Sequence, residues 1–436
     1  MENYTGGGNE IKLYICARQK TEVTVSIPLK GFSNKFTILK DTVIEISLPL
    51  ADGHTTTHEV VDLTGVHIES DFPVSVSAMN LRGATTDATV VLPLKNIPIN
   101  PRYVTGHPGF RGFSGLATNE FLIVSPEDRV EIEIVPTSAT LSAKPANTPF
   151  KITLNKGETY QVQSSGLLDG STVRVLNDKK VIVLSGDKCS NFPCVACDHQ
   201  VEQMFPTVLL DTAYCTIPQW GHTKGYVVKV MSIDTLLWIK VNGKSYKIPR
   251  RDSALIFSVP IEDSVLYITA PRKFACFEFM NGTTCNGYVG TGRFGDPSML
   301  QLLSSKYMGQ KSTFSTVTSS SLKGGDHFVS ILIPSSAKND VFLDNTRLSP
   351  SEFIEVTDNK AYSYAKLKLT QGTHTVLCNK GHLAYCYGIS PAESYLYVAG
   401  YSLPNFDISI IDTTLSYNCK DSTVTMRFTA KLEGAI

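Results

Sequence analysis

The chain has 436 residues, of which 42% are hydrophobic and 18% charged, and its 40 basic residues balance its 40 acidic residues. This composition can build several hydrophobic cores, which excludes a disordered chain, and the zero net charge gives no electrostatic support to nucleic-acid binding. We expect no membrane insertion in this chain, because no apolar run reaches the roughly 18 to 20 residues that a membrane-spanning helix needs. The length predicts about two to four domains.

A pattern recurs four times along the chain. A polar turn precedes a short apolar strand at residues 71–80 (DFPVSVSAMN), 178–187 (DKKVIVLSGD), 271–280 (PRKFACFEFM) and 380–389 (KGHLAYCYGI). Similar strand pairs lie upstream of each copy in the same order. A unit of about 100 residues is too long for one propeller blade and fits one small β-sandwich. The alternative is that any β-rich chain gives such alignments by chance.

Strict alternation of apolar and polar residues dominates each unit, as in residues 129–135 (RVEIEIV). Such alternation predicts strands with one buried and one solvated face. We therefore predict an all-β fold of four tandem antiparallel β-sandwich-like repeats. The predicted units are residues 9–107, 118–219 with a Cys-rich loop at 186–206, 225–320 and 326–402. A tail at 403–436 holds two further strands. It either docks on the fourth unit or begins another domain, and we favour the second alternative.

Most of the ten cysteines fall in close groups, which suits local disulfides in an oxidising compartment. The predicted pairs are Cys189–Cys197, Cys276–Cys285, Cys378–Cys386 and Cys194–Cys215, while Cys16 and Cys419 are not placed. The sequons that start at Asn3 and Asn281 are possible glycosylation sites. We expect an extracellular protein whose export signal lies outside this chain, because a polar run follows Met1.

One cluster has the residue types of a catalytic or metal site. Asp198, His199 and Glu202 lie close to three cysteines and could supply zinc ligands. However, no second Cys or His pair follows at the spacing of a zinc finger, and the chain has no G-x-S-x-G or H-E-x-x-H motif. The alternative is that these side chains satisfy the backbone of a long loop. We predict no catalytic residue, no metal and no cofactor.

Tyrosines alternate with other residues near the end of the fourth unit, at Tyr385, Tyr387, Tyr395 and Tyr397. Exposed tyrosines would give a binding surface with a large contact area at low entropic cost. Tyrosines in strands also serve as packing residues, so both interpretations stay open.

The segments SGDKC and ACDHQVEQMFPT, together with SYLYVAG near the end, resemble the N-terminal domain of the IgG Fc-binding protein family. The positions that carry the resemblance are Ser185, Gly186, Cys189, Cys197, Asp198, His199, Glu202, Gln203 and Pro206. The resemblance covers about residues 1–405, and Cys194 is an extra cysteine in a loop that we expect to hold two. Members are typically large secreted or cell-surface proteins, so the resemblance implies binding or adhesion without catalysis. Binding of IgG Fc itself is not carried over.

The leading hypothesis is a non-catalytic extracellular module that engages a protein or glycan partner through the loops of its β-sandwiches. One alternative is a metal-dependent or carbohydrate-active hydrolase centred on Asp198, His199 and Glu202. Another is a structural spacer in a mucus or matrix protein, which would show no saturable ligand. The sequence does not decide whether the four units form a row or a closed ring.

Overall fold

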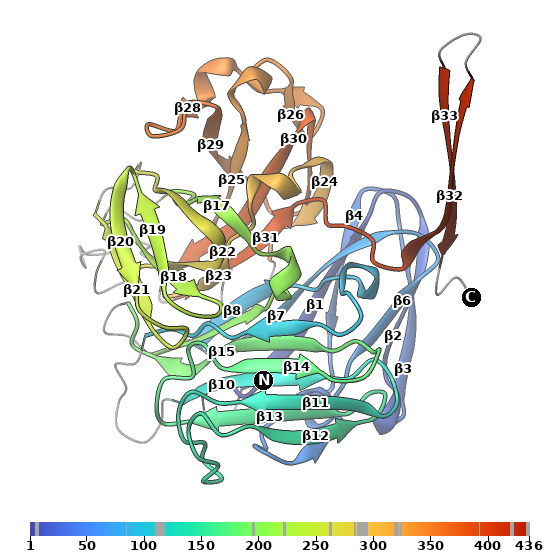
Figure 1. Ribbon diagram of the computed structural model, residues 1–436, viewed down its shortest axis with the longest axis vertical. Coiled ribbons are helices and arrows are strands. Elements are labelled where there is room, and N and C mark those ends of the chain that lie inside the picture. Colours follow the sequence, from blue (N-terminus) through green and yellow to red (C-terminus); the bar gives the residue numbers. More distant parts are fainter. Residues whose placement is uncertain are drawn as a thin grey trace.

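The computed structural model of this chain is built almost entirely of β-strands (Figure 1). It describes residues 1–4, 8–83, 85–109, 118–193, 197–220, 224–260, 264–282, 285, 295–317, 322, 325–391, 393–418 and 423–432, with backbone alone from residue 408 onward. Within these ranges the helical elements are short: α1 (Leu50–Gly53), η1 (Pro28–Lys30), η2 (Leu94–Asn96), η3 (Thr207–Leu209), η4 (Ser305–Tyr307), η5 (Ser335–Ala337) and η6 (Pro350–Glu352). The predicted all-β class with antiparallel sheets is confirmed.

The first region packs two antiparallel sheets face to face. Its strands are β1 (Asn9–Ala17), β2 (Thr21–Ile27), β3 (Phe32–Ile38), β4 (Thr42–Ser47), β6 (His67–Ser70), β7 (Val74–Arg82) and β8 (Thr85–Val90). One sheet has the order β4-β1-β7-β8 and the other β3-β2-β6. Alternate residues such as Ile15, Val25 and Ile38 fill a separate hydrophobic core between them, as expected when each strand turns one face inward.

The second region repeats this pairing scheme. Its strands are β10 (Asn119–Val124), β11 (Val130–Val135), β12 (Phe150–Leu154), β13 (Thr159–Ser164), β14 (Thr172–Val175), β15 (Ile182–Ser190) and β16 (Asp198–Gln203). One sheet contains β13-β10-β15-β16 and the other β12-β11-β14. The alternation predicted for residues 129–135 is present, since Val130, Ile132 and Ile134 are buried.

The third and fourth regions use the same scheme with one modification. A single long strand, β22 (Tyr267–Met280) or β30 (Thr373–Ser390), pairs with strands on both sides, so the strands of each region form one continuous sheet. The other strands of the third region are β18 (Tyr226–Ser232), β19 (Leu237–Val241), β20 (Lys244–Ile248), β21 (Ala254–Val259) and β23 (Met299–Gln301). Those of the fourth are β25 (Asp326–Pro334), β26 (Val341–Leu343), β27 (Thr346–Arg347), β28 (Ile354–Glu355), β29 (Tyr362–Leu369) and β31 (Glu393–Gly400).

Connecting strands join each region to the next. β5 (Val61–Asp62) pairs with β13, and β9 (Arg102–Val104) pairs with β14. In the same way β17 (Asp211–Cys215) pairs with β22, and β24 (Gly309–Ser315) pairs with β30. Each of these strands precedes the region whose sheet it completes, so neighbouring regions share backbone hydrogen bonds.

The four regions close into a ring. Strand β8 packs against both β16 and β31, and β23 packs against the same two strands. Figure 1 shows the regions around a common centre, with the blue first region beside the orange fourth region. Strand β24 also packs against β1 and β7, which joins the end of the chain to its beginning. The sequence did not decide between a row and a closed ring, and these contacts show the ring.

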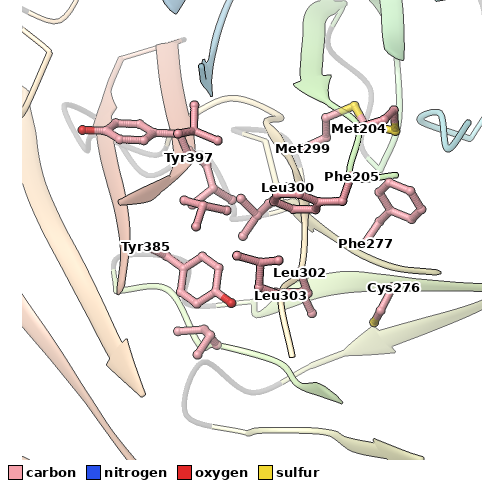
Figure 2. Close-up of a cluster of buried hydrophobic side chains, with 14 of the residues drawn as sticks. Met204, Phe205, Cys276, Phe277, Met299, Leu300, Leu302, Leu303, Tyr385 and Tyr397 are labelled. Atoms are coloured by element: carbon pink, nitrogen blue, oxygen red, sulfur yellow. The ribbon is translucent and has the colours of Figure 1, made fainter. Parts of the chain in front are cut away.

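The centre of the ring is a hydrophobic core to which several regions contribute (Figure 2). Met204 and Phe205 follow β16, Met299 and Leu300 come from β23, and Tyr397 comes from β31. Each fully buried side chain of this size contributes roughly 1.5 to 3 kcal/mol relative to an exposed one. Because this core belongs to no single region, the regions depend on one another for stability.

The last two strands, β32 (Ile408–Asn418) and β33 (Thr423–Leu432), form a separate antiparallel pair. In Figure 1 this red hairpin projects from the ring. The tail was predicted to hold two strands about a turn, and the backbone shows this hairpin. In the part of the chain that the structure describes, none of the helices is long and apolar enough to cross a membrane.

Candidate functional site

The segment that carries the family resemblance is the hairpin of β15 and β16. At Gly186 the two strands approach so closely that an added Cβ would lie 1.8 Å from the backbone oxygen of Gln200, which only glycine avoids. Cys189 and Cys197 form a disulfide with a Cα–Cα distance of 5.0 Å, the pair that we predicted. The hydroxyl of Ser185 donates a hydrogen bond of 2.7 Å to the backbone oxygen of Gly106. These residues shape and anchor the hairpin.

The three residues of the alternative hydrolase site, Asp198, His199 and Glu202, bind different parts of the chain. Successive side chains of a strand point to opposite faces, so His199 is turned away from Asp198 and Glu202. The two ring nitrogens of His199 contact the backbone oxygen of Asp187 at 3.0 Å and the side-chain amide of Asn80 at 3.1 Å. Burial lowers the pKa of His199 to about 3, which keeps the imidazole neutral. His199 therefore does not share partners with Asp198 and Glu202, and among the described residues no three potential ligands converge on a metal position.

Three residues of the motif instead bind the neighbouring strand β8 and the segment after it. A carboxylate oxygen of Asp198 accepts a hydrogen bond of 2.7 Å from the backbone amide of Thr86. Glu202 accepts one of 2.8 Å from the hydroxyl of Thr89, and Gln203 accepts one of 3.1 Å from the backbone amide of Leu92. The polar residues of β16 therefore join the first region to the second.

Acidic residues from the other regions meet Asp198 at the centre of the ring. One oxygen of Asp87 accepts hydrogen bonds from the backbone amides of Val201 at 3.2 Å and Met299 at 3.1 Å, so a single carboxylate links three regions. The backbone amide of Asp296 donates to the hydroxyl of Ser394 at 2.7 Å, which links the third region to the fourth. Glu393 begins β31 beside them. We call Asp87, Asp198, Asp296 and Glu393 the central carboxyl cluster.

The central carboxyl cluster is buried, and burial decides its protonation. Desolvation raises the pKa of Asp296 to about 7, and that of Glu393 to about 8. The pKa of Asp198 lies well above its usual value, first because of burial and then because Asp296, Glu393 and Asp87 repel its charge. Among the described residues, one oxygen of Asp198 and one of Asp296 have no hydrogen-bond partner. An uncompensated buried carboxylate is costly, so these groups hold protons in the folded chain.

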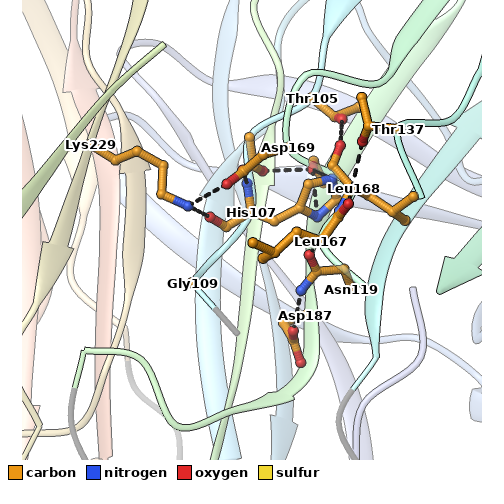
Figure 3. Close-up of polar contacts among 12 residues, drawn as sticks. Thr105, His107, Gly109, Asn119, Thr137, Leu167, Leu168, Asp169, Asp187 and Lys229 are labelled. Atoms are coloured by element: carbon orange, nitrogen blue, oxygen red, sulfur yellow. Dashed lines mark hydrogen bonds and ion pairs between the residues drawn. The ribbon is translucent and has the colours of Figure 1, made fainter. Parts of the chain in front are cut away.

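A different polar contact joins the second and third regions (Figure 3). The Lys229 side chain is buried in β18, and its ammonium donates hydrogen bonds of 2.7 Å to Asp169 and 2.5 Å to the backbone oxygen of His107. The other oxygen of Asp169 accepts from the backbone amide of His107 at 2.7 Å. The ammonium also lies 5.5 Å from the ring centre of Phe192. Sequence reasoning missed this pair, because its members are 60 residues apart and no local pattern connects them.

The remaining predicted disulfides are wrong where the structure describes both partners. Cys378 and Cys386 are free and buried; they lie eight residues apart on β30, roughly 25 Å along an extended strand, whereas a disulfide needs Cα atoms within about 7 Å. Cys276 is free, while Cys285 forms a disulfide with another residue. Cys215 is also free, which excludes its pairing with Cys194. Cys194 and Cys419 lie outside the described residues, and Cys16 is a free buried thiol.

The two possible glycosylation sites are not accessible. Asn3 is buried, and its side-chain amide donates a hydrogen bond of 3.0 Å to the backbone oxygen of Thr85. Asn281 is also buried, and its side-chain amide donates one of 2.8 Å to the backbone oxygen of Gly225. A glycan on either asparagine would have to displace this packing, so glycosylation at Asn3 and Asn281 stays a prediction that the fold does not favour.

Of the two interpretations of the tyrosines, the structure supports packing, and the exposed aromatic side chains include Phe72, Trp220 and Trp238. Tyr387 and Tyr395 are fully buried. Trp220 is 46% exposed, and its ring lies 5.8 Å from that of Phe328, which stacks on Tyr387 at 5.3 Å. The backbone amide of Trp220 donates to the Tyr387 hydroxyl at 2.7 Å. Tyr387 and Phe328 thus support the exposed Trp220, which is a candidate contact point. A lone tryptophan carries no pattern that could have marked it in the sequence.

The comparisons with known proteins agree with the motif. A family model described as IgGFc binding protein matches residues 87–388, more than half of the chain. A human protein named IgGFc-binding protein is 32% identical over 152 residues, which is 34% of this chain and 3% of that protein. The chain therefore aligns with only a small part of that relative's length. The family match runs from Asp87 through the β15–β16 hairpin into β30, which includes most of the ring. The chain belongs to the IgGFc-binding protein family.

Proposed function

We propose that this chain is a non-catalytic, extracellular binding module that engages a protein or glycan partner. The main observation behind the proposal is that the polar side chains of the family motif are buried and hydrogen-bonded within the chain. Asp198, His199 and Glu202 are fully buried and bound to other parts of the ring, so they hold the scaffold together and meet no substrate. Family membership supports a binding role, and the disulfide of Cys189 and Cys197 supports an oxidising compartment.

We further propose that the scaffold consists of four tandem β-sandwich-like units near residues 9–107, 118–219, 225–320 and 326–402. The recurring pairing scheme of their strands supports this division. A closed ring of such units holds its outer loops in fixed positions, and a rigid surface loses less entropy when it binds a partner. Trp220, supported by Phe328, is the best anchor that we find, because tryptophan dominates many binding interfaces.

The test is direct binding to the purified, non-reduced chain. The chain would be immobilised and exposed to IgG Fc, whose binding is stated in the name of the human relative, and to a panel of glycans and extracellular proteins. We expect saturable binding of at least one of these, weakened tenfold or more by Trp220→Ala. Trp238→Ala is the matched control, because Trp238 is 53% exposed but lies on the separate strand β19.

Two results would overturn the proposal. Absence of any saturable ligand would favour a structural spacer. Turnover of glycoside or ester substrates that is abolished by His199→Ala, in a variant that keeps the native melting temperature, would show catalysis.

A further inference from the structure

The seam where the ring closes contains a cleft. It has a volume of about 310 Å³ and lies between β1 and β7 of the first region and β24 and β31 of the fourth. Sites for small molecules have similar or larger volumes. Since β1 and β24 are about 300 residues apart in the sequence, this cleft exists only when the ring is closed.

The cleft carries positive charge only. Arg18, Lys95 and Lys311 line it, and none of the described residues that line it is acidic. The Nε of Arg18 donates a hydrogen bond of 3.0 Å to the hydroxyl of Thr313 on β24, which holds the guanidinium across the seam. Arginine remains charged at all physiological pH values. Asp41 lies close enough to act on the charge of Arg18 but does not line the cleft. In a chain of zero net charge, three cations in the lining of one cleft favour an anionic ligand.

The rest of the cleft is lined by apolar side chains, such as Val74 and Val90, and by hydroxyl groups. Ser75 and Ser77 contribute from β7, and Thr313 from β24. A hydroxyl both donates and accepts hydrogen bonds, so such a wall suits a ligand that also carries many hydroxyls. An arginine beside it can bind a carboxylate or sulfate with two parallel hydrogen bonds.

We propose that this seam cleft binds an acidic saccharide, with its carboxylate or sulfate group on Arg18 and Lys311 and its hydroxyls against the serines of β7. The inference rests on the proposed function and names the ligand class of one site. It requires the closed ring, because Arg18 and Lys311 come from the first and fourth regions.

Isothermal titration with the whole chain tests the inference. The probes are a sialylated lactose, a sulfated lactose, neutral lactose and inorganic sulfate. We expect saturable binding of an acidic lactose, at least tenfold weaker binding of lactose and of sulfate, and weaker binding in 500 mM than in 50 mM salt because exposed charges are screened. The double variant Arg18→Gln/Lys311→Gln should weaken binding of the acidic lactose at least tenfold.

Lys35→Gln is the matched control, because Lys35 is an exposed lysine of β3 in the first region and does not line the cleft. It should leave the affinity unchanged. Equal affinity for sulfate and the acidic lactose would overturn the saccharide assignment. Acidic saccharide binding that the double variant does not weaken, in a chain with the native melting temperature, would overturn this site and leave the binding module intact. Failure of all four probes while the chain binds another ligand saturably would also overturn this inference alone, whereas no saturable ligand of any kind would overturn both proposals.

Discussion

Two buried polar sites hold the ring together, and they balance their charge in opposite ways. Between the second and third regions, Lys229 is paired with Asp169, so a positive and a negative charge are buried together. The centre of the ring instead brings three carboxyl groups together, those of Asp198, Asp296 and Glu393. Among the described residues, none of these three forms an ion pair. The first site is an ion pair, whereas burial and mutual repulsion raise the pKa values of the carboxyl groups at the second. Burial alone therefore does not predict how a polar site responds to mutation or pH; the neighbouring charge decides it.

The largest expected effect comes from breaking the ion pair. Lys229→Met should destabilise the chain by about 3 to 5 kcal/mol, because it leaves the carboxylate of Asp169 buried without its cation. Urea unfolding followed by circular dichroism would measure this change. Lys229→Met/Asp169→Leu should recover much of the loss, since both charges are then removed. A single variant as stable as the parent chain would show that the pair is unimportant.

The central carboxyl cluster should make stability fall as the pH rises. The folded pKa of Asp296 is about 7 and that of Glu393 about 8, both above the ordinary values of 3.8 and 4.5. The folded chain thus binds more protons than the unfolded chain between these limits, and its free energy of unfolding decreases with pH. We expect a loss of about 2 kcal/mol between pH 6.5 and 8. Buried histidines such as His199 act in the opposite direction, but only below about their ordinary pKa of 6.5.

Unfolding curves of the parent chain and of Asp296→Asn/Glu393→Gln at pH 6.5, 7.25 and 8 would measure this effect. The variant should show a flatter profile than the parent chain. Glu278, another buried carboxyl group with a pKa of about 8, contributes to the part that remains. Identical slopes in both proteins would contradict the assignment of this pH dependence to the ring centre.

A smaller effect is expected at Asp87, the member of the central carboxyl cluster that accepts hydrogen bonds from backbone amides of two other regions. One oxygen of its carboxylate accepts hydrogen bonds from the backbone amides of Val201 and Met299. Its other oxygen accepts a hydrogen bond from the backbone amide of Ala88. Asp87→Asn keeps one acceptor oxygen and loses the hydrogen bond to the other, so it should cost about 1 kcal/mol, the typical net value of one lost hydrogen bond. Denaturant unfolding measures it, with Asp71→Asn as the exposed control in the first region. A loss above about 3 kcal/mol would show that the charge itself is needed, as it is at Lys229.

The last prediction concerns cysteine oxidation and involves no change in stability. Alkylation of the unfolded, non-reduced chain followed by peptide mass mapping should label Cys16, Cys215, Cys276, Cys378 and Cys386. Cys189, Cys197 and Cys285 should remain unlabelled, because they are in disulfides. Detection of a bond between Cys378 and Cys386 would mean that β30 is not one continuous strand.

Local patterns predicted the secondary structure well and the long-range contacts poorly. The alternation around Ile132 marked a strand because burial of one face leaves a period of two in the sequence. The pair Cys189–Cys197 was predictable because a hairpin brings its own ends together. The pair Cys378–Cys386 failed for the same reason: close spacing implies contact only if a turn intervenes, and here one strand continues through both residues.

The motif residues were found, but the sequence suggested a different role for them. Adjacent Asp198 and His199 suggested a shared site, whereas strand geometry turns them to opposite faces and toward different partners. The partners Thr86, Asp296 and Glu393 could not be found from the sequence, because they lie in other regions and meet Asp198 only after the ring closes.

The amino-acid sequence by itself determined the all-β class, the alternating strands, one disulfide and the family, because these depend on neighbouring residues or on a short motif. The tertiary structure decided that the chain closes into a ring, that the motif carboxyls become buried and protonated, and that a cationic cleft forms where β1 meets β24. The physical reason is that side-chain burial and charge compensation are set by segments far apart in the chain, and a one-dimensional pattern carries no record of which segments will meet.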